Sequence, residues 1–213
     1  MTLYTHKSSN IRKTWILFAV FLVVVIAIGW TFSRIYNNPG ILYFAVIFSV
    51  AMNFISYWWS DKIVLRMAGA KPVERKDFSE FYNVVENLAI TAGLPLPKIY
   101  IIPEAQPNAF ATGRNPEHAV VAVTEGLLRR LDRSELEGVL AHELAHIGNR
   151  DILLSSVVVV LVGFISILSD WFLRSSFWGG GRSRDDRGGG QAQAIFMLIG
   201  IILAILAPIA ALM

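Results

Sequence analysis

Cysteine is absent from the 213-residue chain, and charged side chains are scarce. Without cysteine no disulfide framework can form, and a metal could be bound only by His, Asp or Glu. Only 16% of the residues are charged, whereas soluble proteins carry roughly a quarter. The formal net charge is +3, and the basic residues lie beside apolar segments rather than along one soluble face. We therefore expect no nucleic-acid partner.

Long apolar segments account for the low charge. Apolar residues make up 54% of the chain, and the mean hydropathy is +0.53. A helix needs about 20 mostly apolar residues to cross a bilayer. Four segments approach that length: Trp15 to Phe32, Ile41 to Trp59, Ile152 to Leu173 and Ala194 to Met213. The first two, joined by a short link, are predicted to form an antiparallel hairpin in the lipid bilayer. The last two are either spans or apolar helices packed in a protein core.

The basic residues that flank these segments predict the orientation of the chain. Lys and Arg gather before the first segment and after the second, while the link between them holds only Arg34. By the positive-inside rule, residues 60–150 face the cytoplasm. If the third segment crosses, the arginines that follow it lie on the opposite side, against the rule: Arg174, Arg182, Arg184 and Arg187. Either the first hairpin dominates the topology, or segments 152–173 and 194–213 do not fully span.

Residues 60 to 150 are predicted to form a small helix-plus-sheet domain. A helix starts near Asp77–Glu80 and ends at Gly93 and Pro95. Short strand-like runs follow, bounded by turn residues: Lys98–Ile102, Asn108–Thr112 and Ala119–Thr124. A short helix over Glu125–Leu131 precedes a longer one, which a capping box at Ser134–Glu137 starts and which continues to at least Arg150. The fold class is therefore an α+β integral membrane protein, mostly helical.

The run His142-Glu143-Leu144-Ala145-His146 lies on that longer helix. Residues four apart share a helix face, so two imidazoles at this spacing can hold one zinc ion. Glu143 follows His142 directly, and its carboxylate projects beside the metal, where it can accept a proton from water and pass it to a leaving amine. This is the HExxH arrangement of zinc metalloproteases. His6 and His118 lie in a polar tail and after a turn, and we expect them at the surface.

The surroundings of this motif resemble the HtpX-type membrane proteases, within the wider family that includes the CAAX prenyl proteases. The resemblance rests on AHELAHIGNRDILLSS and on PNAFATGRNPEHAVVAVTEGLL, and it covers essentially the whole chain. It implies a zinc endopeptidase of the bacterial inner membrane that faces the cytoplasm and removes damaged or misassembled membrane proteins under stress. His142 and His146 would be zinc ligands, one ion per chain, and Glu143 the catalytic carboxylate. The segment Asn108, Ala109, Phe110 and Ala111 would be the edge strand beside which an extended substrate lies.

This chain departs from the family at the third zinc ligand. The resemblance implies a Glu beyond the fourth apolar segment, but no Glu follows Glu143. We expect the ligand to lie beyond Met213, so that the 213-residue form binds zinc weakly and is inactive. Asp151 is expected to face away from the site, about 140° around the helix from His146, and to pair with Arg150 or cap backbone groups.

The resulting domain prediction has three parts. Residues 1–60 form a transmembrane hairpin, residues 61–151 the N-terminal part of a zinc metalloprotease domain, and residues 152–213 a second apolar hairpin with a Gly-rich linker at 174–193. Because Ile152 starts an apolar segment, the zinc helix is expected to run nearly straight into the membrane. The site would then lie roughly 10–15 Å from the bilayer and act on loops of membrane proteins or unfolded polypeptides.

Two alternatives remain open at this point. One is a CAAX-type processing protease with a narrow substrate, which would need a closed chamber and more spans than the two that precede the motif. The other is a truncated, inactive membrane protein that binds or regulates a partner, which the absent Glu supports. The oligomeric state has no signal in the sequence.

Overall fold

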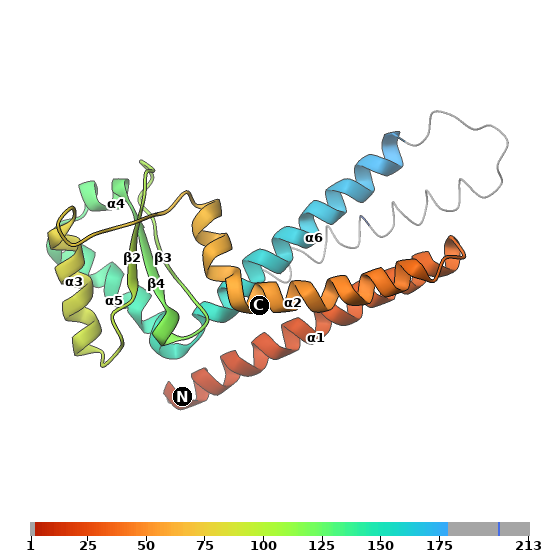
Figure 1. Cartoon of the computed structure of the whole chain (residues 1–213). Coiled ribbons are helices and arrows are strands. Elements are labelled where there is room, and N and C mark those ends of the chain that lie inside the picture. The colour runs from red at the N-terminus through yellow and green to blue at the C-terminus, as the bar shows by residue number, and fades with distance from the viewer. Residues whose placement is uncertain (1–2, 179–199, 201–213) are drawn as a thin grey trace. The chain divides into compact units, whose positions relative to one another are not determined.

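The computed structural model describes residues 3–178 and Gly200 (Figure 1). It confirms an α+β protein with long apolar helices and a small sheet. The chain divides into two compact units. Unit 1 comprises Met1–Ala19 and Asn53–Val157, and unit 2 comprises Val20–Met52 and Val158–Met213. The predicted linker 174–193 and the fourth apolar segment, 194–213, fall largely or wholly outside the described residues.

Two helices are long and apolar enough to cross a membrane. Helix α1 covers Leu3–Ile35 and helix α2 covers Gly40–Met67, with candidate spans at Lys7–Ile35 and Gly40–Met67. Both helices extend beyond the predicted apolar segments, because flanking polar residues continue the helical turns. Within unit 2 the two helices pack closely: a Cβ on Gly29 would collide with the Cβ of Ala45. The link contains Asn37 with a φ of 48°, a left-handed conformation that asparagine tolerates.

The third apolar segment forms helix α6, Ile152–Trp178. Among the described residues, it adds a third candidate span only if it is counted together with the helix before it. That helix, α5, covers Arg133–Asn149, and its axis makes an angle of 88° with α6. The expectation that the zinc helix runs nearly straight into the membrane is therefore wrong. Arg150 ends α5 in a left-handed conformation (φ 55°), which turns the chain before the apolar helix starts.

A sheet of four strands in the order β1-β2-β4-β3 lies in unit 1. Strands β1 (Lys71–Pro72) and β2 (Lys98–Ile102) are antiparallel, β2 and β4 (Val120–Thr124) are parallel, and β4 and β3 (Ala109–Thr112) are antiparallel. The three predicted strands are present, although β3 and β4 each begin one residue later than expected. The pairing places β3 at one edge of the described sheet, with Phe110 opposite Ala122.

Both faces of the sheet are covered, and side chains of β4 point alternately to one face and the other. Val121 and Val123 contact α5 and helix α3 (Ser79–Thr91) in the main core of unit 1. Val120 and Ala122 point to the other face, where they pack with Leu65 near the end of α2. All five residues of β4 are buried, as expected for a strand between two layers. The last turns of α2 therefore belong to the core of the sheet domain.

Two predicted helix starts need correction. Helix α3 begins at Ser79, but its N-cap residue is Phe78, and no side chain caps it. Helix α5 begins with Asp132 as its N-cap, two residues before the predicted Ser134, and Asp132 and Glu135 form the capping box. Both Asp132 and Ser134 are acceptors three residues before a Glu, so spacing alone could not separate them. Helix α4 covers Glu125–Arg130, close to the prediction.

Candidate active site

Helix α5 carries the candidate site along one border of its core-facing stripe. Its buried residues follow helical spacing: Leu136, Leu140, Leu144 and Ile147. His142 is exposed, whereas Glu143 and His146 are half-buried. The packed apolar stripe fixes the rotation of the helix about its axis, and that rotation places both histidines outside the stripe and Glu143 at its border.

The two histidines point at one another. The Nε2 atoms of His142 and His146 lie 3.2 Å apart, and the ring centroids are 4.7 Å apart. Two nitrogens bound to one tetrahedral zinc ion at 2.0–2.1 Å would be separated by about 3.3 Å. The structure therefore places the Nε2 pair at the separation that two zinc ligands require.

Asp151 contacts the second histidine, contrary to the expectation that it faces away. Its Oδ2 lies 2.9 Å from Nδ1 of His146. The prediction extended the helix through residue 151, but α5 ends at Asn149 and the left-handed Arg150 turns Asp151 back toward the site. A carboxylate at this place accepts the Nδ1–H hydrogen bond, which leaves the Nε2 lone pair of His146 free to bind a metal.

Glu143 has an environment suited to proton transfer. Burial raises the pKa of its carboxyl above the ordinary value of 4.5, while the nearby His146, the backbone N–H of Ala111 and His142 act in the opposite direction. A carboxyl with a raised pKa is a better base than one that is fully solvated. The contact with Ala111 places this group beside β3, consistent with the packing of α5 against that strand.

The predicted substrate strand turns alternate main-chain groups away from β4, and one of them, the N–H of Ala111, contacts the carboxylate of Glu143. Asn108 accepts a hydrogen bond from the N–H of Thr124, which identifies the residues that pair with β4. Because such bonds alternate along an antiparallel pair, Phe110 and Thr112 also face β4, whereas Ala109 and Ala111 face the open edge. Of the predicted segment, Asn108 lies just before the strand and Ala109, Phe110 and Ala111 lie within it.

The side chains at the candidate site supply part of the ligand set of a zinc ion. Two imidazole nitrogens at ligand spacing, one of them oriented by a carboxylate, suit a zinc ion. Among residues 3–178 and Gly200, no group of three His, Cys, Asp or Glu side chains comes together as a metal site. The described residues thus supply two ligands, and a catalytic zinc ordinarily has three from protein.

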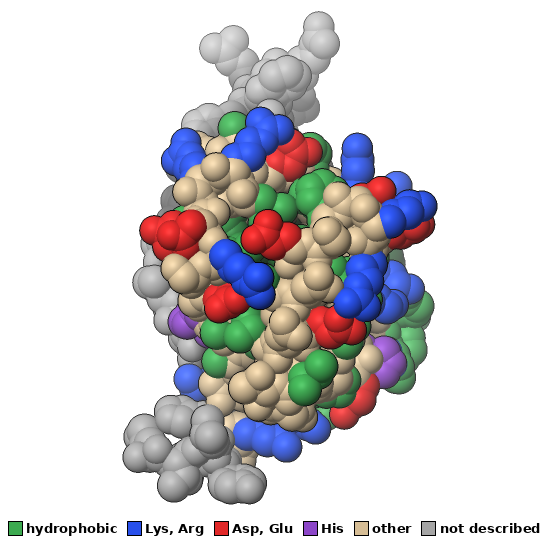
Figure 2. All heavy atoms as spheres, turned by 90° about the vertical axis from the view of Figure 1, so that its left-hand side faces the viewer, with side chains coloured by type: hydrophobic (Ala, Val, Ile, Leu, Met, Phe, Trp, Pro, Cys, Tyr) green, Lys and Arg blue, Asp and Glu red, His purple; other side chains and the backbone are tan. Residues whose placement is uncertain are grey.

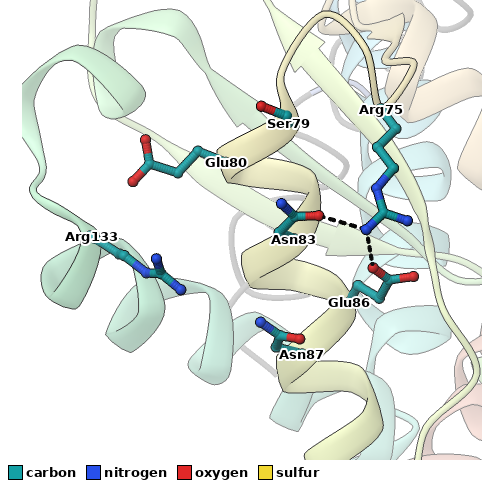
Figure 3. Close-up of a pocket in the computed structure, with 7 residues that line it drawn as sticks. All are labelled: Arg75, Ser79, Glu80, Asn83, Glu86, Asn87 and Arg133. Carbon is teal, nitrogen blue, oxygen red and sulfur yellow. Dashed lines mark hydrogen bonds and ion pairs between the residues drawn. The ribbon is translucent and has the colours of Figure 1, made fainter.

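A separate hollow of about 440 Å³ lies between α3 and the start of α5 (Figure 3). Arg75 donates there to Asn83 and forms an ion pair with Glu86 at 3.0 Å. The lining also contains Glu80 and Arg133, so charges of both signs face the hollow. Basic and acidic side chains are likewise interspersed over the face of the molecule in Figure 2. The hollow includes neither histidine of the candidate site.

Sequence reasoning missed the role of Asp151 and a buried contact that holds β3. The hydroxyls of Thr112, the last residue of β3, and Ser156 in α6 lie 2.6 Å apart. A helix end at Asn149–Arg150, directly before the apolar run, would have predicted that Asp151 lies outside the helix and can turn back toward the site. The Thr112–Ser156 pair left no signal, because the two residues are 44 positions apart.

The fold and the site together define a class: a membrane protein with the HExxH helix of the metalloproteases. Comparison with known families agrees, because residues 75–213 match the model of peptidase family M48. Curated relatives are named "Protease HtpX homolog". The relative from Caldanaerobacter subterraneus subsp. tengcongensis is 47% identical over 98% of this chain and 70% of its own length.

Two further relatives show the same extent of similarity. The protein from Thermoanaerobacter pseudethanolicus is 46% identical over 98% of this chain and 70% of its own length. The protein from Thermococcus sibiricus is 47% identical over 94% of this chain and 66% of its own length. The chain belongs to peptidase family M48, with HtpX-type proteases among its relatives. The resemblance inferred from the sequence is thereby confirmed.

Proposed function

We propose that this membrane protease is a zinc-dependent endopeptidase in which His142 and His146 bind one zinc ion and Glu143 is the general base. The observation that carries the proposal is the 3.2 Å separation of the two Nε2 atoms, with Glu143 beside them on the same helix. A bound zinc ion would polarise the scissile carbonyl and acidify water. The third protein ligand that such a site requires is not among the described residues.

Other residues of the chain orient a zinc ligand, transfer the proton and bind the substrate. Asp151 holds His146 in the tautomer that presents Nε2. Glu143 removes a proton from the attacking water and delivers it to the leaving amine. The open edge of β3 pairs with the substrate backbone through the N–H and C=O groups of Ala109 and the C=O of Ala111, so that binding depends little on substrate sequence.

The substrates we propose are loops of misfolded or damaged membrane proteins and other unfolded polypeptides. The apolar helix α6 begins at Ile152, six residues after His146. A membrane-anchored substrate would therefore be present at high effective concentration near the site. We propose the bacterial cytoplasmic membrane as the location, with the site in the cytoplasm and a role in protein quality control under stress. Support comes from the basic flanks of the first two apolar segments.

Zinc content and proteolysis, measured on the same preparations, test the chemistry. We would compare two forms of the protein: the chain itself and a version extended with the C-terminal segment of a longer relative. Each form is measured with and without the substitution Glu143→Gln. The expected result is cleavage of a misfolded membrane substrate by the extended form, lost by at least a hundredfold in Glu143→Gln while zinc content is unchanged. An extended form that holds no zinc and cuts nothing would contradict the proposal. It would favour the alternative of a membrane protein that binds a partner, which the incomplete ligand set among the described residues also supports.

A further inference from the structure

Arg114, two residues after β3, is a cation without an acidic partner in the described part of the chain. Its guanidinium lies 4.5 Å from the ring centroid of Trp58 on α2, and one NH2 group is 2.7 Å from Nε2 of His118. The other ring nitrogen of His118 contacts the side-chain oxygen of Asn115 at 2.7 Å. Among the described residues, no carboxylate lies within ion-pair distance of Arg114. These contacts use one of its five N–H donors, so four remain, of which two can bind the oxygens of one anion.

Trp58 marks the level of the bilayer surface on α2. It stands within Tyr57-Trp58-Trp59, where the apolar segment gives way to Ser60, Asp61 and Lys62. Aromatic residues with an apolar body and a polar edge favour the headgroup region. The Trp58 side chain is accessible, with 42% of the residue exposed. Arg114 stacked on this ring therefore lies where lipid headgroups would be.

A second cation lies on the same side of α2. Lys62 follows Trp58 by four residues, which makes the two side chains neighbours on the helix surface. Lys62 is exposed and makes no ion pair within the described part of the chain. Asp61 is the one acidic residue next to it in sequence, and it forms no ion pair there either. The indole of Trp58 thus has one cation stacked on it and a second one turn away.

We propose that Arg114, Lys62 and Trp58 form a binding site for the phosphate of an anionic phospholipid. The planar guanidinium suits bidentate binding of phosphate oxygens, the ammonium adds a second positive charge, and the indole supports the guanidinium at headgroup depth. Because Arg114 follows β3 by two residues, the bound lipid holds the end of the substrate edge strand at the membrane surface. The site uses none of the residues assigned to catalysis, so its occupancy can be measured without proteolysis.

The test is lipid retention by the purified protein in detergent, measured by native mass spectrometry. The probes are palmitoyl-oleoyl phosphatidylglycerol and the zwitterionic palmitoyl-oleoyl phosphatidylcholine, which has the same acyl chains. We expect a preference for phosphatidylglycerol that Arg114→Gln and Lys62→Gln each reduce about fivefold. Asp61→Asn should increase the preference, since it removes a nearby negative charge. Arg130→Gln on α4, an exposed arginine without an ion pair in the described structure, should leave it unchanged.

The outcomes separate a specific site from bulk charge and from free phosphate. An unchanged preference in Arg114→Gln and Lys62→Gln would overturn the proposal, as would an equal loss in Arg130→Gln. If millimolar inorganic phosphate displaces the lipid, the ligand is free phosphate and the lipid site is wrong; retention in its presence supports the lipid. Should Arg114→Gln not fold in detergent, Lys62→Gln and Arg130→Gln decide the question, because both remove one exposed positive charge and only the first should reduce the preference.

Discussion

The buried hydroxyls of Thr112 and Ser156 lie 2.6 Å apart and join the end of β3 to the first turns of α6. Ser156 also donates to the carbonyl oxygen of Ile152 at 2.6 Å. A hydroxyl has a single proton, so Thr112 must be the donor to Ser156. The substrate edge strand is therefore tied to the same short stretch that carries Asp151, and both sides of the site are fixed to the start of the apolar helix.

Ser156→Ala should destabilise unit 1 by about 1–3 kcal/mol, because it leaves the buried Thr112 hydroxyl without its partner. Thr112→Val should cost less, since Ser156 keeps its bond to Ile152. The double variant should be more stable than the sum of the single effects predicts. Denaturant unfolding of the three variants in detergent measures these differences. Strictly additive effects would show that the two hydroxyls do not interact.

Asp151→Asn should weaken zinc binding about 10- to 100-fold, because an amide oxygen is a poorer acceptor for the Nδ1–H of His146 than a carboxylate. Competition with a chromogenic chelator measures the affinity. The control is Asp132→Asn, which changes a carboxylate at the opposite end of α5. Equal zinc affinities in the two variants would remove Asp151 from the metal site.

Ala111→Pro removes the backbone N–H that faces the open edge of β3 and keeps the bonds to β4. We expect the fold to survive, since proline is tolerated on sheet edges. We expect kcat/KM to fall at least tenfold, because the Glu143 carboxylate loses the N–H that Ala111 donates to it.

The contrasting change is Phe110→Pro, which removes an N–H that pairs with β4 and should therefore lower the melting temperature. Both variants are compared by thermal melting and by peptide hydrolysis in a form that shows activity. Full activity of Ala111→Pro would mean that the contact between the Ala111 N–H and Glu143 is not needed for catalysis.

The capping box of α5 gives the stability of unit 1 a pH dependence. Hydrogen bonds from the backbone N–H of Glu135 and from Ser134 hold the pKa of Asp132 below its ordinary value of 3.8. A carboxyl whose pKa is lowered by folding stabilises the protein above the unfolded value and loses that contribution as the pH falls through the folded value.

The variant Asp132→Asn keeps a side-chain oxygen that can cap the helix, but its amide does not titrate. Its melting temperature should therefore fall less steeply than that of the parent below about pH 4. Asp132→Ala should be less stable than the parent near neutral pH. Circular dichroism melting in detergent over this range provides the measurement. If the melting temperatures of the parent and of Asp132→Asn fall equally steeply below about pH 4, this carboxylate makes no contribution.

Much of the fold follows from local patterns. The start and stop residues of a helix predicted α3, and strand-like runs bounded by turn residues predicted β2 and β4. The short strand β1 was missed, because two residues carry no periodicity. The start of α5 was misplaced because Asp132 and Ser134 both satisfy the same spacing rule, and the start of α3 was misplaced because its N-cap, Phe78, has no capping side chain.

The sequence by itself determined the chemistry available to this protein. It supplied two imidazoles four residues apart on a helix, a carboxylate beside them, apolar segments of bilayer length and no thiolates. Only the tertiary structure decided that Asp151 turns back onto His146, that the end of α2 covers one face of the sheet, and that β3 lies at its edge beside Glu143. The physical reason is that periodicity encodes which face of an element is buried, whereas chain turns such as the left-handed Arg150 and pairs such as Thr112 and Ser156 depend on packing between distant segments.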